Sequence, residues 1–252
     1  MGCERSRGVE RGQVSTPRIS VLMPVYNAAG FLAEAVESVL RQTRADFEFI
    51  IIDDGSTDAS GAMLAAYAAK DRRIRLVTRP NTGYAAALNE MLGYAAAPLL
   101  ARMDADDIAM PARFEEQAAY LDAHPECVAV GSRVLLIDEE GAPIRDMATS
   151  ERHEQIDAEH MRGEGGAIIH PAAMIRADAV RRIGGGPRER RPPEGPGPFL
   201  RLAAGARRAA RRRLPPAPGG GRVLGGISPP QNFFLKKLKD GPFLGGHCHT
   251  VF

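Results

Sequence analysis

Blocks of apolar residues alternate with amphipathic stretches through the first hundred residues and predict four strands and three helices. Apolar, β-branched runs typical of buried strands occupy residues 18–25, 47–54, 74–78 and 98–104. Between them, apolar residues recur at helical spacing in residues 29–43, 56–70 and 84–95. Strands that alternate with helices through short connections predict a mostly parallel α/β sheet, Rossmann-like, with helices on both faces.

Polar residues follow each predicted strand directly. The four loops begin with "VYN", "DDGSTD", "RPNTGY" and "DADD". The carboxyl ends of parallel strands share one edge of a sheet, and open α/β sheets bind their ligands beyond that edge. We therefore expect the four loops to gather around one site, although each loop taken alone also fits an ordinary turn.

The fourth loop carries three carboxylates within four positions, Asp104, Asp106 and Asp107. Carboxylates this close repel one another unless a cation or a set of hydrogen-bond donors lies between them. The four loops contain no Cys and no His, which disfavours zinc or copper, whereas clustered carboxylates suit Mg²⁺ or Mn²⁺. Such an ion commonly also binds water and phosphate oxygens. Asp107 has a second interpretation, as the cap of a helix that starts near Pro111.

Composition favours a soluble globular protein in a reducing, cytoplasmic compartment. The 252 residues are 44% hydrophobic, and no apolar run approaches the roughly 20 residues of a membrane-spanning helix. Cys3, Cys127 and Cys248 are too few and too scattered for a disulfide framework or a zinc site.

The net charge of +2 is the sum of an acidic N-terminal part and a basic C-terminal part of the chain. Residues 1–185 hold 20 Lys and Arg against 28 Asp and Glu, whereas residues 186–252 hold 13 against 3. The second part also contains 12 Gly and 11 Pro, a density that disfavours a packed core. We expect a flexible N-terminus at 1–16, a folded domain at 17–185, and a disordered or poorly folded tail at 186–252.

Five blocks of the domain, in order, resemble the family 2 glycosyltransferases. They are "SVLMPVYNAAGFLAEAVESVLRQT", "FEFIIIDDGSTDAS", "RPNTGYAAALN", "DADDIAMPARFEEQAAYLDAHPE" and "IIHPAAMIRADAVRRIGG". The resemblance implies a GT-A fold and transfer of a sugar from a UDP-, GDP- or dTDP-sugar. The "DAD" stretch resembles the DxD motif of the family. The implied acceptor is a saccharide or a lipid-linked saccharide, in the synthesis of a surface polysaccharide.

The resemblance also implies roles for individual residues. Tyr26 would pack on the nucleotide base, Asp54 would accept a hydrogen bond from it, and Asp53 would shape the loop. Asp104 would face the ribose, and Asp106 would hold the metal that bridges the two phosphates. The implied nucleotide-sugar contacts are Pro24, Tyr26, Asn27, Asp53, Asp54, Asn81, Gly83 and Asp104. Gly83 also fits a turn that requires positive φ.

The catalytic residues implied by the resemblance are weaker candidates. His170, in "IIHP", would enter the acceptor side of the cleft, although a lone His beside a Pro also fits a structural role. "PPEGPGPFLRLA" aligns Glu194 with the first member of the acidic pair of the family and Gly195 with the second. That second residue is the general base, an Asp, which removes the proton of the acceptor hydroxyl in an inverting displacement. Glycine has no group for this role, so Glu194 is the remaining carboxylate nearby.

Two interpretations of the tail and three of the function stay open. The tail fits a reading-frame slip in a GC-rich gene, or a basic segment that contacts anionic lipid at the inner membrane face or nucleic acid. Residues 204–221 contain no aromatic residue for base stacking and no apolar face for a membrane, which disfavours the basic-segment interpretation. The chain is interpreted as an active glycosyltransferase, as a remnant that binds nucleotide-sugar without turnover, or as a nucleotidyltransferase. The last would require a glycine-rich basic loop in place of "VYNAAG".

Overall fold

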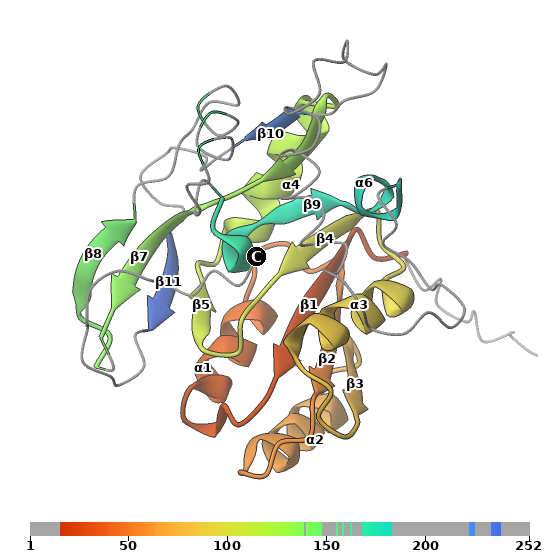
Figure 1. The fold of residues 1–252 in the computed structure, drawn as a ribbon, viewed down its shortest axis with the longest axis vertical. Coiled ribbons are helices and arrows are strands. Elements are labelled where there is room, and N and C mark those ends of the chain that lie inside the picture. Colours follow the sequence, from red (N-terminus) through yellow and green to blue (C-terminus); the bar gives the residue numbers. More distant parts are fainter. Residues whose placement is uncertain are drawn as a thin grey trace, which may run out of the picture.

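Two β-sheets and the helices packed on them form the structure, a computed structural model (Figure 1). It describes residues 16–138, 140–147, 155, 158, 162, 168–182, 222–224 and 233–237. Within this part of the chain, no helix is both long and apolar enough to cross a lipid bilayer.

The larger sheet has seven strands in the order β10-β6-β9-β4-β1-β2-β3. Its strands are β1 (Ile19–Val25), β2 (Phe47–Asp53), β3 (Ile74–Thr78), β4 (Leu99–Arg102), β6 (Cys127–Val130), β9 (Met174–Arg176) and β10 (Arg222–Leu224). Neighbouring strands run parallel except around β9, which is antiparallel to both β4 and β6. The mostly parallel sheet predicted from the hydrophobic pattern is confirmed.

The smaller sheet has four strands in the order β5-β11-β7-β8. They are β5 (Asp107–Ala109), β7 (Arg133–Ile137), β8 (Pro143–Met147) and β11 (Phe233–Lys237). The loop after β4, which carries Asp104, Asp106 and Asp107, is called the acidic loop. The strand β5 begins at its last residue, Asp107, and lies against α1, where Ala109 N donates to Ser38 Oγ at 3.0 Å. The acidic loop is therefore held between the two sheets (Figure 1).

Helices cover both faces of the larger sheet, as the sequence predicted. They are α1 (Ala29–Leu40), α2 (Ser60–Lys70), α3 (Tyr84–Tyr94), α4 (Arg113–Ala123) and α6 (Ala177–Arg182), with a short 3₁₀ turn η1 (His170–Ala172). Buried side chains of α1, α2 and α4 join the hydrophobic cluster on one face, whereas α3 and α6 join a second cluster on the other.

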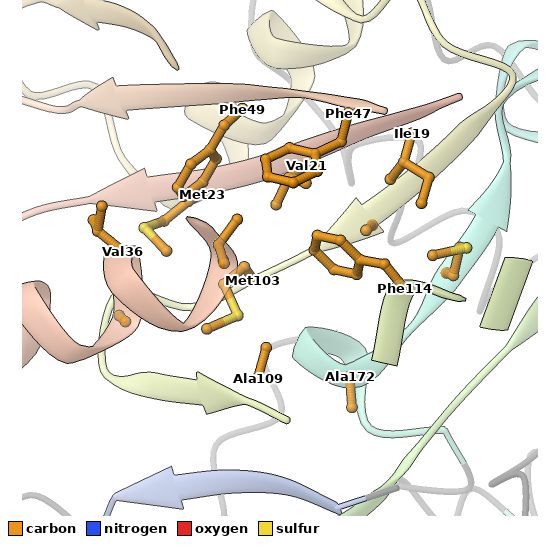
Figure 2. Packing of buried hydrophobic residues seen from close by; sticks show 14 of the residues in the cluster. Ile19, Val21, Met23, Val36, Phe47, Phe49, Met103, Ala109, Phe114 and Ala172 are labelled. Carbon is orange, nitrogen blue, oxygen red and sulfur yellow. The ribbon is translucent and has the colours of Figure 1, made fainter. Parts of the chain in front are cut away.

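The first hydrophobic cluster packs α4 against the beginning of β2 (Figure 2). Phe114 is fully buried and meets Phe47 edge to face, with ring centroids 5.7 Å apart and an interplanar angle of 77°. Edge-to-face aromatic pairs add about 0.5–1.5 kcal/mol to the free energy of area burial. This contact anchors α4, and thus the segment after the acidic loop, to β2.

Two details of helix capping differ from the sequence prediction. The second helix was predicted to span residues 56–70, but α2 begins at Ser60, whose backbone N donates to Asp58 Oδ1 at 2.9 Å. Asp107 was a candidate cap for the helix near Pro111. It instead opens β5, because α4 starts six residues later, at Arg113.

Two segments of the tail that was expected to be poorly folded form strands. β10 pairs with β6, and β11 pairs with β5 and β7. The segment 233–237 contains no Gly or Pro, unlike the tail around it. Local β-propensity therefore explains the difference at that segment. The rest of residues 183–252 lies outside the described residues.

Candidate functional site

The sheet order places the loops after β1 and β4 on either side of a topological switch point. β1 pairs with β2 on one side and with β4 on the other. The chain leaves β1 toward α1 and β2, so the loops after β1 and β4 diverge at the strand ends, which is where open α/β sheets bind their ligands. Tyr26 and Asn27 follow β1, and the acidic loop follows β4.

The three carboxylates of the acidic loop converge. One oxygen from each of Asp104, Asp106 and Asp107 lies within 4.8 Å of the others, and together they form the acidic cluster. Asp107 is fully buried, whereas Asp104 and Asp106 are half-buried and remain accessible. Carboxylate oxygens are the donor set that Mg²⁺ and Mn²⁺ prefer, so these residues fit a hard divalent cation.

Two buried arginines, Arg102 and Arg113, interact with carboxylates of the acidic cluster, and the sequence interpretation missed both. Arg102 ends β4, is 3% exposed, and forms an ion pair with Asp104. Its guanidinium carbon also lies 5.1 Å from the centroid of the Tyr84 ring. This arrangement places a buried positive charge against the acidic cluster.

The guanidinium of Arg113 ties three chain segments together. Its Nη2 donates to the carbonyls of Arg102 at 2.8 Å, Pro171 at 3.1 Å and Ala173 at 3.3 Å. Burial lowers the pKa of Arg113 to about 9, an effect that the nearby charge of Asp107 opposes. The side chain therefore stays positively charged at neutral pH.

His170 lies close to the acidic cluster, in η1. Burial of its ring, together with the charge of Arg102, lowers the pKa of His170 to about 3, and the charge of Asp104 opposes the shift. The imidazole is consequently neutral at neutral pH. The structure thus brings the predicted residue His170 to the same edge as Asp104, where it offers a neutral polar group.

Asp53 and Asp54 are buried and organise the loops around them. Asp53 Oδ1 accepts a hydrogen bond from the backbone N of Ser56 at 3.0 Å. Asp54 accepts from the backbone N of Thr82 at 3.1 Å and of Gly83 at 2.8 Å. Arg79 forms an ion pair with Asp54 at 2.9 Å. Asp54 therefore holds the "NTG" loop, with its two carboxylate oxygens bonded to protein donors.

The residues after β1 divide into an exposed aromatic and a structural amide. Tyr26 is 51% exposed, which suits its ring to stacking. Asn27 adopts a φ of 48°, and its Oδ1 accepts from the backbone N of Thr57 at 2.8 Å. Pro24 is buried within β1 beside Ile52. Tyr26 and Asn27 are both exposed, whereas Pro24 is buried, and the amide oxygen of Asn27 is already bonded within the protein.

The "NTG" loop brings Asn81 and Gly83 to the same edge as Tyr26. Asn81 is exposed, and Gly83 has a φ of 93° where α3 begins. The loop packs closely on Gly55, which has a φ of 78°; a Cβ there would lie 2.7 Å from the backbone N of Asn81. A glycine is thus required at position 55 by both backbone conformation and space.

Replacement of Gly55 by alanine is expected to destabilise the fold by about 2 kcal/mol or more, because the added methyl meets backbone rather than a flexible side chain. Gly93→Ala is a matched control, since a Cβ at this position in α3 meets nothing within 4 Å. That change should stabilise the protein by roughly 0.5–1 kcal/mol. Urea unfolding of both variants measures the difference, and equal midpoints would contradict the close approach of the two loops.

The remaining catalytic candidate, Glu194, and the aligned Gly195 lie outside the described residues. The candidate site residues that the structure describes form two groups. One is the acidic cluster with Arg102, Arg113 and His170, and the other consists of the loops that carry Tyr26, Asp54 and Gly83.

Solved structures share this architecture and define the class as a GT-A glycosyltransferase fold. The mannosyltransferase PcManGT from Pyrobaculum calidifontis, in complex with GDP-Man and Mn²⁺, aligns with a TM-score of 0.57 at 21% identity, covering 87% of this chain and 56% of that chain. S. aureus TarS 1–349 in complex with UDP-GlcNAc aligns with a TM-score of 0.64 at 18% identity, covering 89% of this chain and 59% of that one.

The chain belongs to glycosyl transferase family 2, whose model matches residues 20–184. EpsE of Bacillus subtilis, assigned to the glycosyltransferases, is 36% identical over 173 residues, which are 68% of this chain and 60% of EpsE. The glycosyltransferase GlyG of Streptococcus pneumoniae is 41% identical over 91 residues, 36% of this chain and 30% of GlyG. The chain therefore spans about 60% of the length of EpsE and less of GlyG.

Proposed function

We propose that the protein transfers a sugar from a nucleotide-diphospho-sugar to an acceptor hydroxyl, by an inverting single displacement. The observation that carries the proposal is the convergence of Asp104, Asp106 and Asp107 at the end of β4, beside the switch point of the sheet. Family membership supports the reaction class. The relatives that carry GDP-Man and UDP-GlcNAc support a GDP- or UDP-sugar donor, with a dTDP-sugar as a further candidate.

Different residues of the candidate site would bind different parts of the donor. Asp106, with Asp104 beside it, would hold Mn²⁺ or Mg²⁺, and Tyr26 would stack on the base. When bound, the metal supplies positive charge that stabilises the departing nucleoside diphosphate. Asp54 fixes the "NTG" loop, and Asn81 and Gly83 of this loop would contact the donor. His170 is a neutral candidate for a hydrogen bond to the reacting groups.

The acceptor is proposed to be a saccharide or lipid-linked saccharide in polysaccharide synthesis at the inner face of the cell membrane. The similarity to EpsE of Bacillus subtilis supports membership in a bacterial glycosyltransferase group. Nucleic acid is not among the proposed partners.

A second proposed function is nucleotide-sugar binding without turnover. The observation that favours it is Gly195, which occupies the aligned position of the general base in the sequence. The two proposals share the donor site and differ only in the transfer step.

Metal-dependent binding tests the shared donor site. Calorimetry with UDP, GDP and dTDP should show binding of at least one diphosphate in Mn²⁺, and a loss of about 100-fold or more in EDTA, because the metal neutralises the phosphates against the acidic cluster. Equal binding of all three in EDTA would contradict the proposal. The corresponding nucleoside is a matched control, since it lacks phosphates and should respond little to the metal.

A further inference from the structure

Arg102 presents a buried positive charge with unused hydrogen-bond donors at the edge of the acidic cluster. Its Nη2 forms an ion pair with Asp104. In the part of the chain that the structure describes, no acceptor meets its Nε or Nη1, although the side chain is only 3% exposed. The Tyr84 ring lies over the guanidinium, with the centroid 5.1 Å from the guanidinium carbon. The structure therefore holds this cation in place with two donor atoms unsatisfied.

Arg113 shows that a buried arginine in the same region can satisfy its donors. It is also fully buried, and its Nη2 alone meets three backbone carbonyls, while its Nε donates to Gln117 Oε1 at 3.2 Å. That pattern is typical of a scaffolding role. Arg102 lacks such a pattern, and buried donors without acceptors are costly. The difference points to an acceptor for Arg102 that a ligand supplies.

The charges of the site limit how strongly a cation binds alone. The three carboxylates of the acidic cluster carry three negative charges, and Arg102 and Arg113, which interact with them, carry two positive charges. A divalent cation alone therefore meets a site of about one net negative charge, and it competes with Arg102 for Asp104. A nucleoside diphosphate adds negative charge that attracts both the cation and the guanidinium.

We propose that Arg102 couples binding of the divalent cation to binding of the nucleoside diphosphate. Its ion pair with Asp104 weakens binding of the cation alone, and its Nε and Nη1 donate to phosphate oxygens when the diphosphate binds. A planar guanidinium suits this exchange because its donors match the spacing of phosphate oxygens. The inference rests on the proposed function, and it names a residue that the family resemblance left without a role.

A four-state binding cycle on the full chain tests the coupling. The affinity for Mn²⁺ is measured by electron paramagnetic resonance of the free ion, without nucleotide and with saturating UDP, GDP or dTDP, whichever binds most tightly. The wild-type protein should bind Mn²⁺ at least about tenfold more tightly with the diphosphate. By linkage, Mn²⁺ should raise the affinity for the diphosphate by the same factor.

Arg102→Gln should bind Mn²⁺ alone about tenfold more tightly, because a positive charge is removed and Asp104 is released. The enhancement by the diphosphate should fall about tenfold, because the exchange of partners is lost. Arg102→Lys retains the charge, so its affinity for Mn²⁺ alone should stay within about threefold of wild type, but it lacks the paired donors of the guanidinium and should lose part of the enhancement. Arg102→Met provides the same test if the Gln variant fails to fold, with folding checked by circular dichroism.

Several outcomes would overturn the coupling role. One is an Arg102→Gln variant that is folded and binds Mn²⁺ alone no more tightly than wild type. Another is a wild-type protein that binds Mn²⁺ and the diphosphate without enhancement, a result that requires no variant. Failure of the wild type to bind any of the three diphosphates in Mn²⁺ would overturn the proposed function as well, so the two failures are distinguishable.

Discussion

Replacement of Asp106 by alanine is expected to weaken binding of the nucleoside diphosphate in Mn²⁺ at least about 100-fold, measured by calorimetry. Loss of a residue that only supports a metal ligand costs about 10- to 100-fold in metal affinity or activity, so loss of a direct ligand should reach the upper end. Asp106 is half-buried and is not part of a regular strand or helix, so its removal should leave the fold intact. Binding in EDTA should change little.

Asp178→Ala is the matched control for this prediction. It removes the same charge from α6, where the side chain is 60% exposed and pairs with Arg182 at 2.7 Å. Its binding of the diphosphate should stay within about twofold of wild type, since exposed pairs contribute little. An Asp106→Ala variant that binds as tightly as Asp178→Ala in Mn²⁺ would place the metal elsewhere in the protein.

The central sheet could be predicted because its signals are local. The apolar runs in β1 and β2 are buried along nearly their whole length, so each reads as one uninterrupted stretch. The edge that gathers the loops then follows from the parallel order of the strands. The convergence of Asp104, Asp106 and Asp107 was therefore accessible from the sequence, whereas the position of Asp107 in a strand was not.

Residues whose environment depends on distant segments could not be predicted in the same way. Arg113 begins α4 in a polar stretch, "PARFEE", which is typical of a solvent-facing first turn. It is buried because the carbonyl of Pro171, 58 positions away, accepts its hydrogen bond at 3.1 Å. Arg102 likewise ends an apolar strand, and no local pattern signals its ion pair. The only feature of the sequence that pointed to this ion pair was the position of Arg102 two residues before the DxD motif.

The role of Asp54 also depends on a contact between distant loops. The family resemblance assigned it to the nucleotide base, whereas the structure bonds its oxygens to the backbone of Thr82 and Gly83, 28 and 29 positions along the chain. A carboxylate has further acceptor capacity, so the base contact stays a prediction. The structure adds a link between Asp54 and the "NTG" loop. A change in that loop would move Asp54, so the predicted donor contacts of Asp54 and of Gly83 are not independent.

The chain as written is expected to transfer sugar at least about 100-fold more slowly than a relative with an Asp at the aligned position of Gly195. A positioned general base contributes roughly 10²–10⁴-fold to the rate. Glu194 is the adjacent carboxylate, but it precedes the run "GPGP". Proline and glycine at this density disfavour the helix that would position a base, and a misplacement of about 1 Å can cost on the order of 10²-fold. Donor binding should persist, since its residues come from the ends of the first four strands.

Transfer to acceptor and hydrolysis of donor should therefore be measured separately with the nucleotide-sugar whose diphosphate binds most tightly. Gly195→Asp alone should restore little activity, because the prolines that disfavour the helix remain. Replacing residues 186–225 by the translation of the alternative reading frame should restore transfer if that frame encodes the acidic pair. Gly195→Ala is the matched control for the point change and should behave as the unaltered chain does. Ordinary turnover by the unaltered chain, at about 1–10³ s⁻¹, would mean that the base lies elsewhere and that the alignment of Gly195 is wrong.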